Sequence, residues 1–335
     1  MFPGELDELL PKSVKQIFLF RSKPTRNFFS RIEHFIRRKY LIPSLLRKLS
    51  SSVWYINTIA LDSILLAAEQ LHVTCILHTY ELEQMYAHLS PEKIKRIIEY
   101  PELIISNAEI TTALLKSYGR KKDIVNFYPT LDTSLIKRDV TAYQQKRTEL
   151  GIEKEEFLWV MSGTIDSNKD PLLFIEIASI LKGKCKQARF MWIGGGKDEK
   201  LKELCMRKVA EAGLEKSIIW TGHVAKEYKA YFNCADGFVL TSKIESFSLV
   251  TLEALLLGVP VVANDCGGVA EILQGTYGSL VGGDNRAMDL TSEMEKYMDK
   301  TLLNDPLKQR QRAETFDIKN TAPSWNRILE KFFDQ

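Results

Sequence analysis

Two glutamates and the small and hydroxyl residues around them form the segment of this 335-residue chain most suited to chemistry. Glu245 precedes the run Ser-Phe-Ser-Leu, and Glu253 lies in the almost wholly apolar stretch that ends at Gly258. If a helix begins here, the amides near Phe247 to Leu249 lie at its positive N-terminus, which favours a diphosphate. A carboxylate among leucines usually has a partner, and the vicinal hydroxyls of a ribose could provide one. The alternative is that Glu253 is a solvated helix residue and Glu245 a loop charge.

Glycine and hydroxyl residues gather where the expected strands of the second half end. Ligands bind beyond the carboxyl ends of parallel strands, and small residues there leave backbone N–H groups open to phosphate. Tight turns also need glycine for structural reasons, so either interpretation fits any single turn. The turns are Ser162–Thr164, Gly194–Gly196, Thr221–His223, Thr241–Lys243 and Asn264–Gly268.

The stretch from Glu245 to Gly268 resembles the signature of the retaining glycosyltransferases of family 4. That signature has two glutamates separated by seven residues, a helix of small residues, Gly-x-Pro-Val-Val and a Gly-Gly loop, all present here at matching spacing. The residues are Glu245, Glu253, Gly258, Pro260, Val261, Val262, Gly267 and Gly268, with Glu271 following. The resemblance implies the α/β fold called GT-B, in which two Rossmann-like, doubly wound domains face each other across a cleft. It also implies a nucleotide-diphosphate sugar as substrate, with no metal and no separate cofactor.

The resemblance extends upstream and assigns further residues to the donor site. Lys169 matches a cation that neutralises the donor diphosphate, whereas Thr164 stands where the family usually has an arginine. Gly195 matches a Gly-x-Gly turn, and Gly222 with His223 matches the loop whose backbone reads the base. The predicted nucleotide-sugar contacts are Gly163, Thr164, Lys169, Gly195, Gly222, His223, Ser246, Phe247, Ser248, Leu249 and Glu253.

Three residues are predicted to act in catalysis: His78, Lys169 and Glu245. Lys169 and the helix amides would stabilise the leaving diphosphate electrostatically. By resemblance, Glu245 would hold hydroxyls of the donor sugar and Glu253 the ribose. His78 follows an apolar strand and precedes a polar loop, as does a histidine near the reacting sugar in the family, although a structural role fits equally well.

The elements that must position these residues alternate between short apolar runs and longer amphipathic stretches, a pattern typical of βαβ units. In the second half we expect strands at 157–161, 189–193, 217–221, 237–241 and 259–263, and helices at 170–182, 198–212, 225–234 and 248–257. In the first half the expected strands are 14–20, 53–57, 73–77, 103–106 and 124–128. We therefore expect an acceptor-side domain over 1–140, a nucleotide-sugar-binding domain over 141–318, and a C-terminal helix over 319–335 that returns to the first domain.

The first domain is expected to be shortened. Members of the family usually begin with a strand and a glycine-rich loop that faces the acceptor, and no such loop precedes Val14. Either the chain is truncated, or a partner protein completes the first domain.

Composition and charge narrow the class of protein. With 45% hydrophobic and 27% charged residues the chain is globular, and its five scattered cysteines fit a reducing, cytoplasmic compartment. Between Lys12 and Lys48 eleven residues are basic and one is acidic, although the net charge of the whole chain is only +3. Residues 25–48 have the spacing of a basic amphipathic helix, which favours peripheral contact with an anionic membrane at its inner face. The alternative is a helix packed on the first sheet; nucleic acid is disfavoured because no binding motif accompanies the charge.

These patterns together predict a retaining glycosyltransferase of cell-envelope polysaccharide biosynthesis. It would move a sugar from a nucleotide-sugar donor to a lipid-linked or polysaccharide acceptor. One alternative is a non-catalytic or partner-dependent subunit of a two-component glycosyltransferase. A nucleotide-sugar epimerase of the same fold is disfavoured, because the spacing of Glu245 and Glu253 belongs to the transferases.

Overall fold

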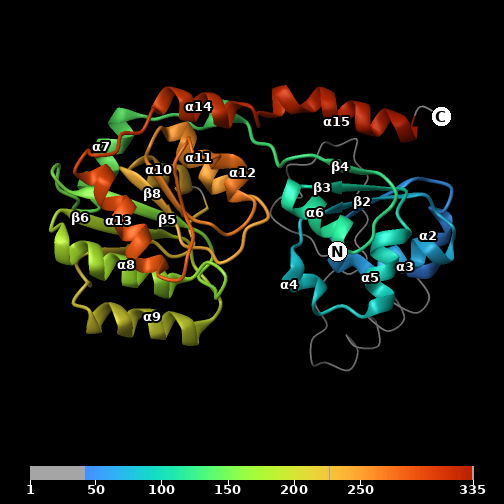
Figure 1. The fold of residues 1–335 in the computed structure, drawn as a ribbon, viewed down its shortest axis with the longest axis horizontal. Helices are drawn as coiled ribbons and strands as arrows, with labels where there is room; N and C mark the ends of the chain where they lie inside the picture. The colour runs from blue at the N-terminus through green and yellow to red at the C-terminus, as the bar shows by residue number, and fades with distance from the viewer. Residues whose placement is uncertain (1–41, 226, 334–335) are drawn as a thin grey trace. The chain divides into compact units, whose positions relative to one another are not determined.

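A computed structural model describes residues 42–225 and 227–333 of the chain. The chain divides into two compact units, of which the first includes the described residues 42–79 together with His88–Ile105 and Tyr118–Asp123, and the second the rest. Each is described by itself (Figure 1). In the part that the structure describes, no helix is both long and apolar enough to span a membrane.

A four-stranded sheet carries the first half of the described chain. Its strands β1 (Trp54–Asn57), β2 (Cys75–Thr79), β3 (Leu103–Ser106) and β4 (Ile124–Asn126) lie side by side in chain order. β1 and β2 are parallel, and Asn57 lies opposite His78. β2 and β3 are buried along their whole length, as expected for strands covered on both faces.

Short helices connect these strands. They are α2 (Ile42–Lys48), η3 (Ile59–Leu61), α3 (Asp62–Gln70), α4 (Glu83–Tyr86), α5 (Pro91–Glu99), α6 (Glu109–Ser117) and η4 (Thr133–Leu135). Arg96 of α5 donates to Glu69 at 2.7 Å and to Asp62 at 2.9 Å, so two ion pairs join α5 to α3.

A six-stranded parallel sheet forms the centre of the second unit. Its strands are β5 (Phe157–Ser162), β6 (Ala188–Ile193), β7 (Ile218–Trp220), β8 (Gly237–Leu240), β9 (Val261–Asn264) and β10 (Ser279–Val281). Their order is β10-β9-β8-β5-β6-β7, and every neighbouring pair is parallel. From β5 the chain proceeds outward to β7 and then returns to place β8 on the other side of β5. This reversal is the topological switch point of a doubly wound sheet, where ligands bind.

Helices cover both faces of this sheet (Figure 1). They are α7 (Val140–Glu149), α8 (Pro171–Lys184), α9 (Glu199–Glu211), α10 (Tyr228–Asn233), α11 (Leu249–Leu257), α12 (Val269–Leu273), α13 (Arg286–Met298) and α14 (Pro306–Glu314). A further helix, α15 (Ile318–Phe333), follows α14 in the chain. α8 packs against α9 and α13 on one face, and α11 packs against α12 and α14 on the other. Asp170 and Asp198 cap α8 and α9 by accepting backbone N–H groups, and Gly258 ends α11 in the left-handed conformation.

Large aromatic side chains fill the space between the sheet and α8. Trp159, Trp192, Phe174 and Phe190 are fully buried. Phe174 meets Trp192 edge-on, with ring centroids 5.3 Å apart. Each such side chain contributes about 1.5–3 kcal/mol through burial, so the sheet is a rigid base for the loops at its carboxyl edge.

The GT-B architecture and most of the expected elements are confirmed. The helix α7 was not among the expected helices, and its Lys146 and Arg147 are buried. β10, α12, α13 and α14 were not expected. The expected strand 14–20 and most of the basic stretch 25–48 lie outside the described residues. The shortened first domain and the boundary near residue 140 stay predictions.

Candidate functional site

An ion pair spans the switch point of the second sheet. Lys169 follows β5, Glu245 follows β8, and the lysine ammonium donates to the carboxylate Oε1. Asp166 fixes the turn before Lys169 by accepting the N–H groups of Asn168 and Lys169, each at 2.9 Å. Thr241 at the end of β8 donates to the carbonyl oxygen of Lys169 at 2.7 Å. The loops after two adjacent strands are therefore joined at the position where a ligand is expected.

Close backbone packing explains the glycines beside this pair. A Cβ on Gly268 would lie 1.8 Å from the carbonyl oxygen of Ser246, which no side chain can tolerate. The N–H of Gly268 donates to the carbonyl oxygen of Glu245 at 2.8 Å, and the N–H of Glu245 to that of Cys266 at 2.8 Å. A Cβ on Gly163 would lie 3.2 Å from the stem of Lys169. These glycines let the loops approach closely enough to form the ion pair.

The N-terminus of α11 follows Glu245 directly. Ser248 is its N-cap residue, and the first backbone bond of the helix joins the N–H of Thr251 to the carbonyl oxygen of Ser248 at 3.2 Å. The preceding amides are the donors that helix geometry leaves open to an anion. The Phe247 ring is buried against Phe316, at 5.3 Å between centroids, so only its backbone can face a ligand. Ser246 accepts a hydrogen bond from Asn107 at 2.9 Å.

Glu253 has a protein partner. The hydroxyl of Tyr228 donates to Glu253 Oε2 at 2.5 Å, and the Ser162 hydroxyl donates to Tyr228 at 3.4 Å. Burial raises the pKa of Glu253, and the bond from Tyr228 acts in the opposite direction. Burial beside this carboxylate also raises the pKa of Tyr228. The expectation that a carboxylate in this apolar helix has a partner is confirmed, since Tyr228 provides one. The role of Glu253 toward a ribose stays a prediction.

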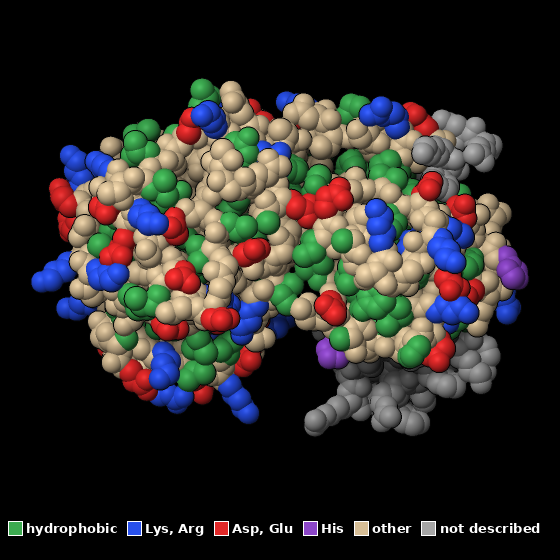
Figure 2. Space-filling model, viewed as in Figure 1, with side chains coloured by type: hydrophobic (Ala, Val, Ile, Leu, Met, Phe, Trp, Pro, Cys, Tyr) green, Lys and Arg blue, Asp and Glu red, His purple; other side chains and the backbone are tan. Residues whose placement is uncertain are grey.

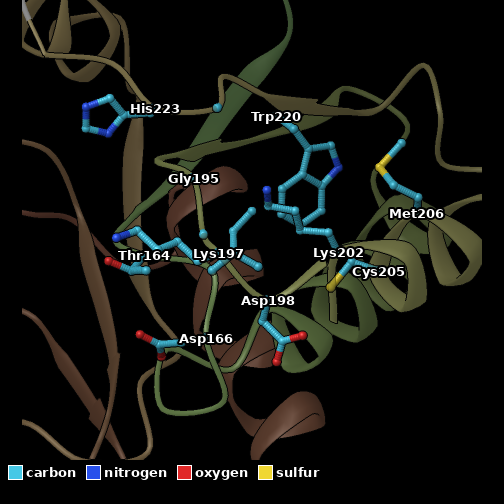
Figure 3. Close-up of a pocket in the computed structure, with 13 residues that line it drawn as sticks. Thr164, Asp166, Gly195, Lys197, Asp198, Lys202, Cys205, Met206, Trp220 and His223 are labelled. Atoms are coloured by element: carbon cyan, nitrogen blue, oxygen red, sulfur yellow. The ribbon is translucent and has the colours of Figure 1, made fainter. Parts of the chain in front are cut away.

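A pocket of about 780 Å³ lies beyond the ends of β5, β6 and β7 (Figure 3). Hydrogen bonds join the loops that line it. The N–H of Ile165 donates to the carbonyl oxygen of Gly195 at 2.9 Å, and the N–H of Gly194 donates to Thr221 Oγ1 at 3.2 Å. Its lining residues are Thr164, Ile165, Asp166, Gly195, Gly196, Lys197, Asp198, Lys202, Cys205, Met206, Trp220, Gly222 and His223. Trp220, Cys205 and Met206 provide an apolar end. Burial raises the pKa of the Cys205 thiol to about 11, so this cysteine is not a thiolate nucleophile at neutral pH.

His78 ends a strand of the first sheet. It lies in β2, is buried, and its Nδ1 shares a hydrogen bond with the hydroxyl of Tyr55. The two rings also meet edge-on at 6.0 Å between centroids. The histidine is thus held in a fixed orientation within its own unit, and its role near a reacting sugar stays a prediction.

The structure brings the predicted residues of the second unit into neighbouring groups. Lys169, Glu245, Gly163 and the start of α11 surround the switch point, and four other predicted residues line the large pocket: Thr164, Gly195, Gly222 and His223. Glu253 does not line that pocket; it lines a smaller one together with Tyr228. Their assignments as nucleotide-sugar contacts stay predictions.

Sequence reasoning did not single out Asp166, Lys197, Trp220 or Tyr228. Asp166 could have been predicted, because an aspartate side chain commonly accepts the backbone N–H groups two and three residues later and so indicates a turn. Tyr228 could not, because 25 residues separate it from Glu253. Among the described residues no group of three or more His, Cys, Asp or Glu is arranged to hold a metal ion.

The strand order and the glycine-rich turns define an α/β domain of the doubly wound class. The match to known proteins is more specific. Residues 156–300 match the family model described as Glycosyl transferases group 1.

Relatives and solved structures agree with this assignment. A D-inositol 3-phosphate glycosyltransferase of Pseudarthrobacter chlorophenolicus is 29% identical over 238 residues, covering 69% of this chain and 54% of the relative. The structure of Anabaena HepE in complex with UDP is similar with a TM-score of 0.78 and 19% identity, covering 87% of this chain and 82% of that one. The structure of a glycosyltransferase from Rickettsia africae has the same TM-score with 15% identity, and the match covers 99% of this chain and 87% of that one. These structures show a GT-B glycosyltransferase fold.

The chain spans about half the length of the curated relatives it matches, between 49% and 57% for three D-inositol 3-phosphate glycosyltransferases.

Proposed function

We propose that this protein transfers a sugar from a nucleotide-sugar donor to a lipid-linked or saccharide acceptor with retention of configuration. The observation that carries the proposal is the Lys169–Glu245 pair across the switch point, followed directly by the open N-terminus of α11. The family match over residues 156–300 and the structure of HepE in complex with UDP support a nucleoside diphosphate as the ligand here.

The chemistry of the site suits departure of a diphosphate. Breaking the bond between sugar and diphosphate adds negative charge to the leaving oxygen, and fixed positive charge lowers the energy of that transition state. Lys169 and the amides near Leu249 provide such charge. Glu245 can accept hydrogen bonds from sugar hydroxyls through the oxygen that does not bind Lys169. On this proposal the site needs no metal and no separate cofactor.

A thermal-shift panel tests the donor assignment. UDP-, GDP-, ADP- and dTDP-sugars would be added to the wild-type chain, to Lys169→Ala, and to Lys184→Ala. Lys184 is a matched control because it also forms an ion pair, with Glu295 at 2.8 Å, but on the far end of α8. Ligand at 100 times its Kd adds about 2.7 kcal/mol of stability, so one donor class should raise the Tm by several degrees in the wild type and in Lys184→Ala only. A panel in which no donor raises the Tm contradicts the proposal.

The alternative of a non-catalytic subunit makes a different prediction. In that case donors would bind without turnover, and a second protein would restore the reaction. Nothing in the comparisons favours this alternative over an enzyme. Measuring release of nucleoside diphosphate by the purified chain distinguishes the two.

We further propose that the acceptor is presented at an anionic membrane surface. The proposal rests on the eleven basic residues between Lys12 and Lys48, because each basic residue near such a surface contributes about 1 kcal/mol. The charge reversals Arg37→Glu, Arg38→Glu and Lys39→Glu should abolish flotation with anionic liposomes. Flotation that persists in the triple variant contradicts membrane contact through this segment.

A further inference from the structure

The large pocket contains one lysine that no carboxylate neutralises. Two lysines line it, and Lys202 donates to Glu199 at 2.9 Å. Lys197 is exposed and forms no ion pair or hydrogen bond with any residue that the structure describes. Lys169 nearby is paired with Glu245. Lys197 is therefore the cation of this region that remains available to an anionic ligand.

The backbone holds Lys197 beside the turn after β5. Ile165 and Gly195 are bonded at 2.9 Å, and a Cβ on Gly196 would lie 2.3 Å from the carbonyl oxygen of Ile165. Lys197 follows this contact directly, and its side chain extends toward Thr164 on the opposite wall (Figure 3). A flexible four-carbon stem on a fixed loop can bring an ammonium group to several positions along that wall.

The two aspartates that line the pocket accept hydrogen bonds from backbone N–H groups. Asp166 accepts two N–H groups of its own turn, and Asp198 accepts the N–H of Leu201 at 3.1 Å as the cap of α9. Neither forms an ion pair with Lys197 among the described contacts. An unpaired ammonium beside open backbone turns favours a ligand that carries several negative charges.

We propose that Lys197 contacts the diphosphate of the bound nucleotide and supplies the positive charge that Thr164, on the facing wall, cannot. This inference rests on the proposed function, since it assumes a nucleoside diphosphate in this region. Lys197 would be a specificity residue: it distinguishes charged nucleotides from neutral nucleosides. A solvated surface lysine with no ligand contact is the competing explanation.

Calorimetric titration of the full chain tests this proposal. The probes are UDP, GDP, ADP and dTDP, each compared with its nucleoside. Lys197→Ala should weaken the best diphosphate about tenfold, in the range of one partly exposed charge-assisted contact, and leave the nucleoside unchanged. Lys200→Ala is the matched control, because Lys200 is exposed on the same segment but does not line the pocket. Adding Thr164→Arg to Lys197→Ala should restore most of the lost affinity.

The outcomes separate this inference from the function on which it rests. If the wild type binds a diphosphate and Lys197→Ala binds it equally well, Lys197 is only a surface residue. Equal weakening of diphosphate and nucleoside would also overturn the proposal, because the loss would then come from the pocket as a whole. If the wild type binds none of the four diphosphates, the proposed function fails and this inference fails with it.

Discussion

At the scale of single residues, the ion pair between Lys169 and Glu245 has a measurable consequence. In the structure Glu245 partly neutralises the lysine that is proposed to bind the diphosphate. Glu245→Gln should therefore tighten binding of the free nucleoside diphosphate, by about threefold to tenfold. The same change should slow sugar transfer, because the carboxylate that accepts sugar hydroxyls is lost.

Titration calorimetry and a transfer assay on Glu245→Gln measure the two effects separately. Nucleotide affinity that falls together with the transfer rate would show that Glu245 supports the fold of the loop rather than the donor sugar.

The partly buried pair of Glu253 and Tyr228 predicts a pH dependence of stability. Burial raises the pKa of Glu253 above its ordinary value of 4.5, so the folded state holds a proton that the unfolded state has released. Stability is then lost as the pH rises from 4.5 through the folded pKa. Glu253→Gln cannot ionise, so its free energy of unfolding relative to wild type should increase across this range.

Urea unfolding at a series of pH values checks this sign, and a constant difference between the two proteins would contradict it. Tyr228→Phe removes the hydrogen bond at 2.5 Å and leaves the partly buried carboxylate of Glu253 without this donor. It should cost about 1–3 kcal/mol at neutral pH.

At the scale of elements, the loop before α12 depends on a glycine. Gly268→Ala would place Cβ 1.8 Å from the carbonyl oxygen of Ser246 and must displace the loop that carries Glu245. We expect a loss of about 3 kcal/mol or more, the range of severe local clashes. Gly183→Ala is the matched control, because nothing lies within 4 Å of its added Cβ and it lies inside α8. That change should stabilise the protein by about 0.5–1 kcal/mol.

Thermal or urea unfolding of both alanine variants measures the difference. Equal stability of the two would mean that the loop containing Ser246 relaxes without strain.

The helix α7 is anchored by one partly buried carboxylate. Asp236 accepts from Arg147 at 2.5 Å, from Tyr143 at 2.6 Å and from the N–H of Leu158 at 2.8 Å. Asp236→Ala should cost about 3–5 kcal/mol, because it leaves a buried guanidinium without its partner. Gln145→Ala removes an exposed side chain of the same helix and should change stability by less than about 0.5 kcal/mol. Urea unfolding of the two variants tests the contrast, and similar losses would contradict the anchoring role.

This anchor explains how a helix of polar sequence packs within the second unit. Its sequence is polar, and polarity indicates a linker unless the buried partners of the charges are known. Arg147 and Asp236 are 89 residues apart, so no local pattern reveals their bond. The strands of the second sheet were predictable because each is a short apolar run between turn residues. Ser279–Val281 in β10 was missed because three residues give no such pattern.

At the scale of the whole molecule, charge is distributed unevenly along the sequence. On the face of the second unit that Figure 2 shows, basic and acidic side chains of the described residues are interspersed. The excess of basic residues lies before Lys48, largely outside the described part. Any electrostatic attraction to an anionic surface is therefore expected from this segment.

The candidate site was only partly predictable at this scale. The spacing of Glu245, Glu253 and the Gly-Gly loop predicted the resemblance to a glycosyltransferase family, and the family match over 156–300 confirms that resemblance. The roles of these residues at the donor stay predictions. The partners of these residues, Lys169 for Glu245 and Tyr228 for Glu253, come from separate loops and helices. Folding brings them together through the strand order, which the sequence alone does not specify residue by residue.

The central claim is that the switch point of the second sheet binds a nucleoside diphosphate through Lys169. Calorimetric titration of the wild-type chain and of Lys169→Ala with UDP, GDP, ADP and dTDP tests it most directly. We predict saturable binding of at least one of them by the wild type, weakened at least about tenfold by the substitution, as expected for a partly buried charge-assisted contact. Absence of binding to all four, or equal binding by both proteins, would contradict the claim.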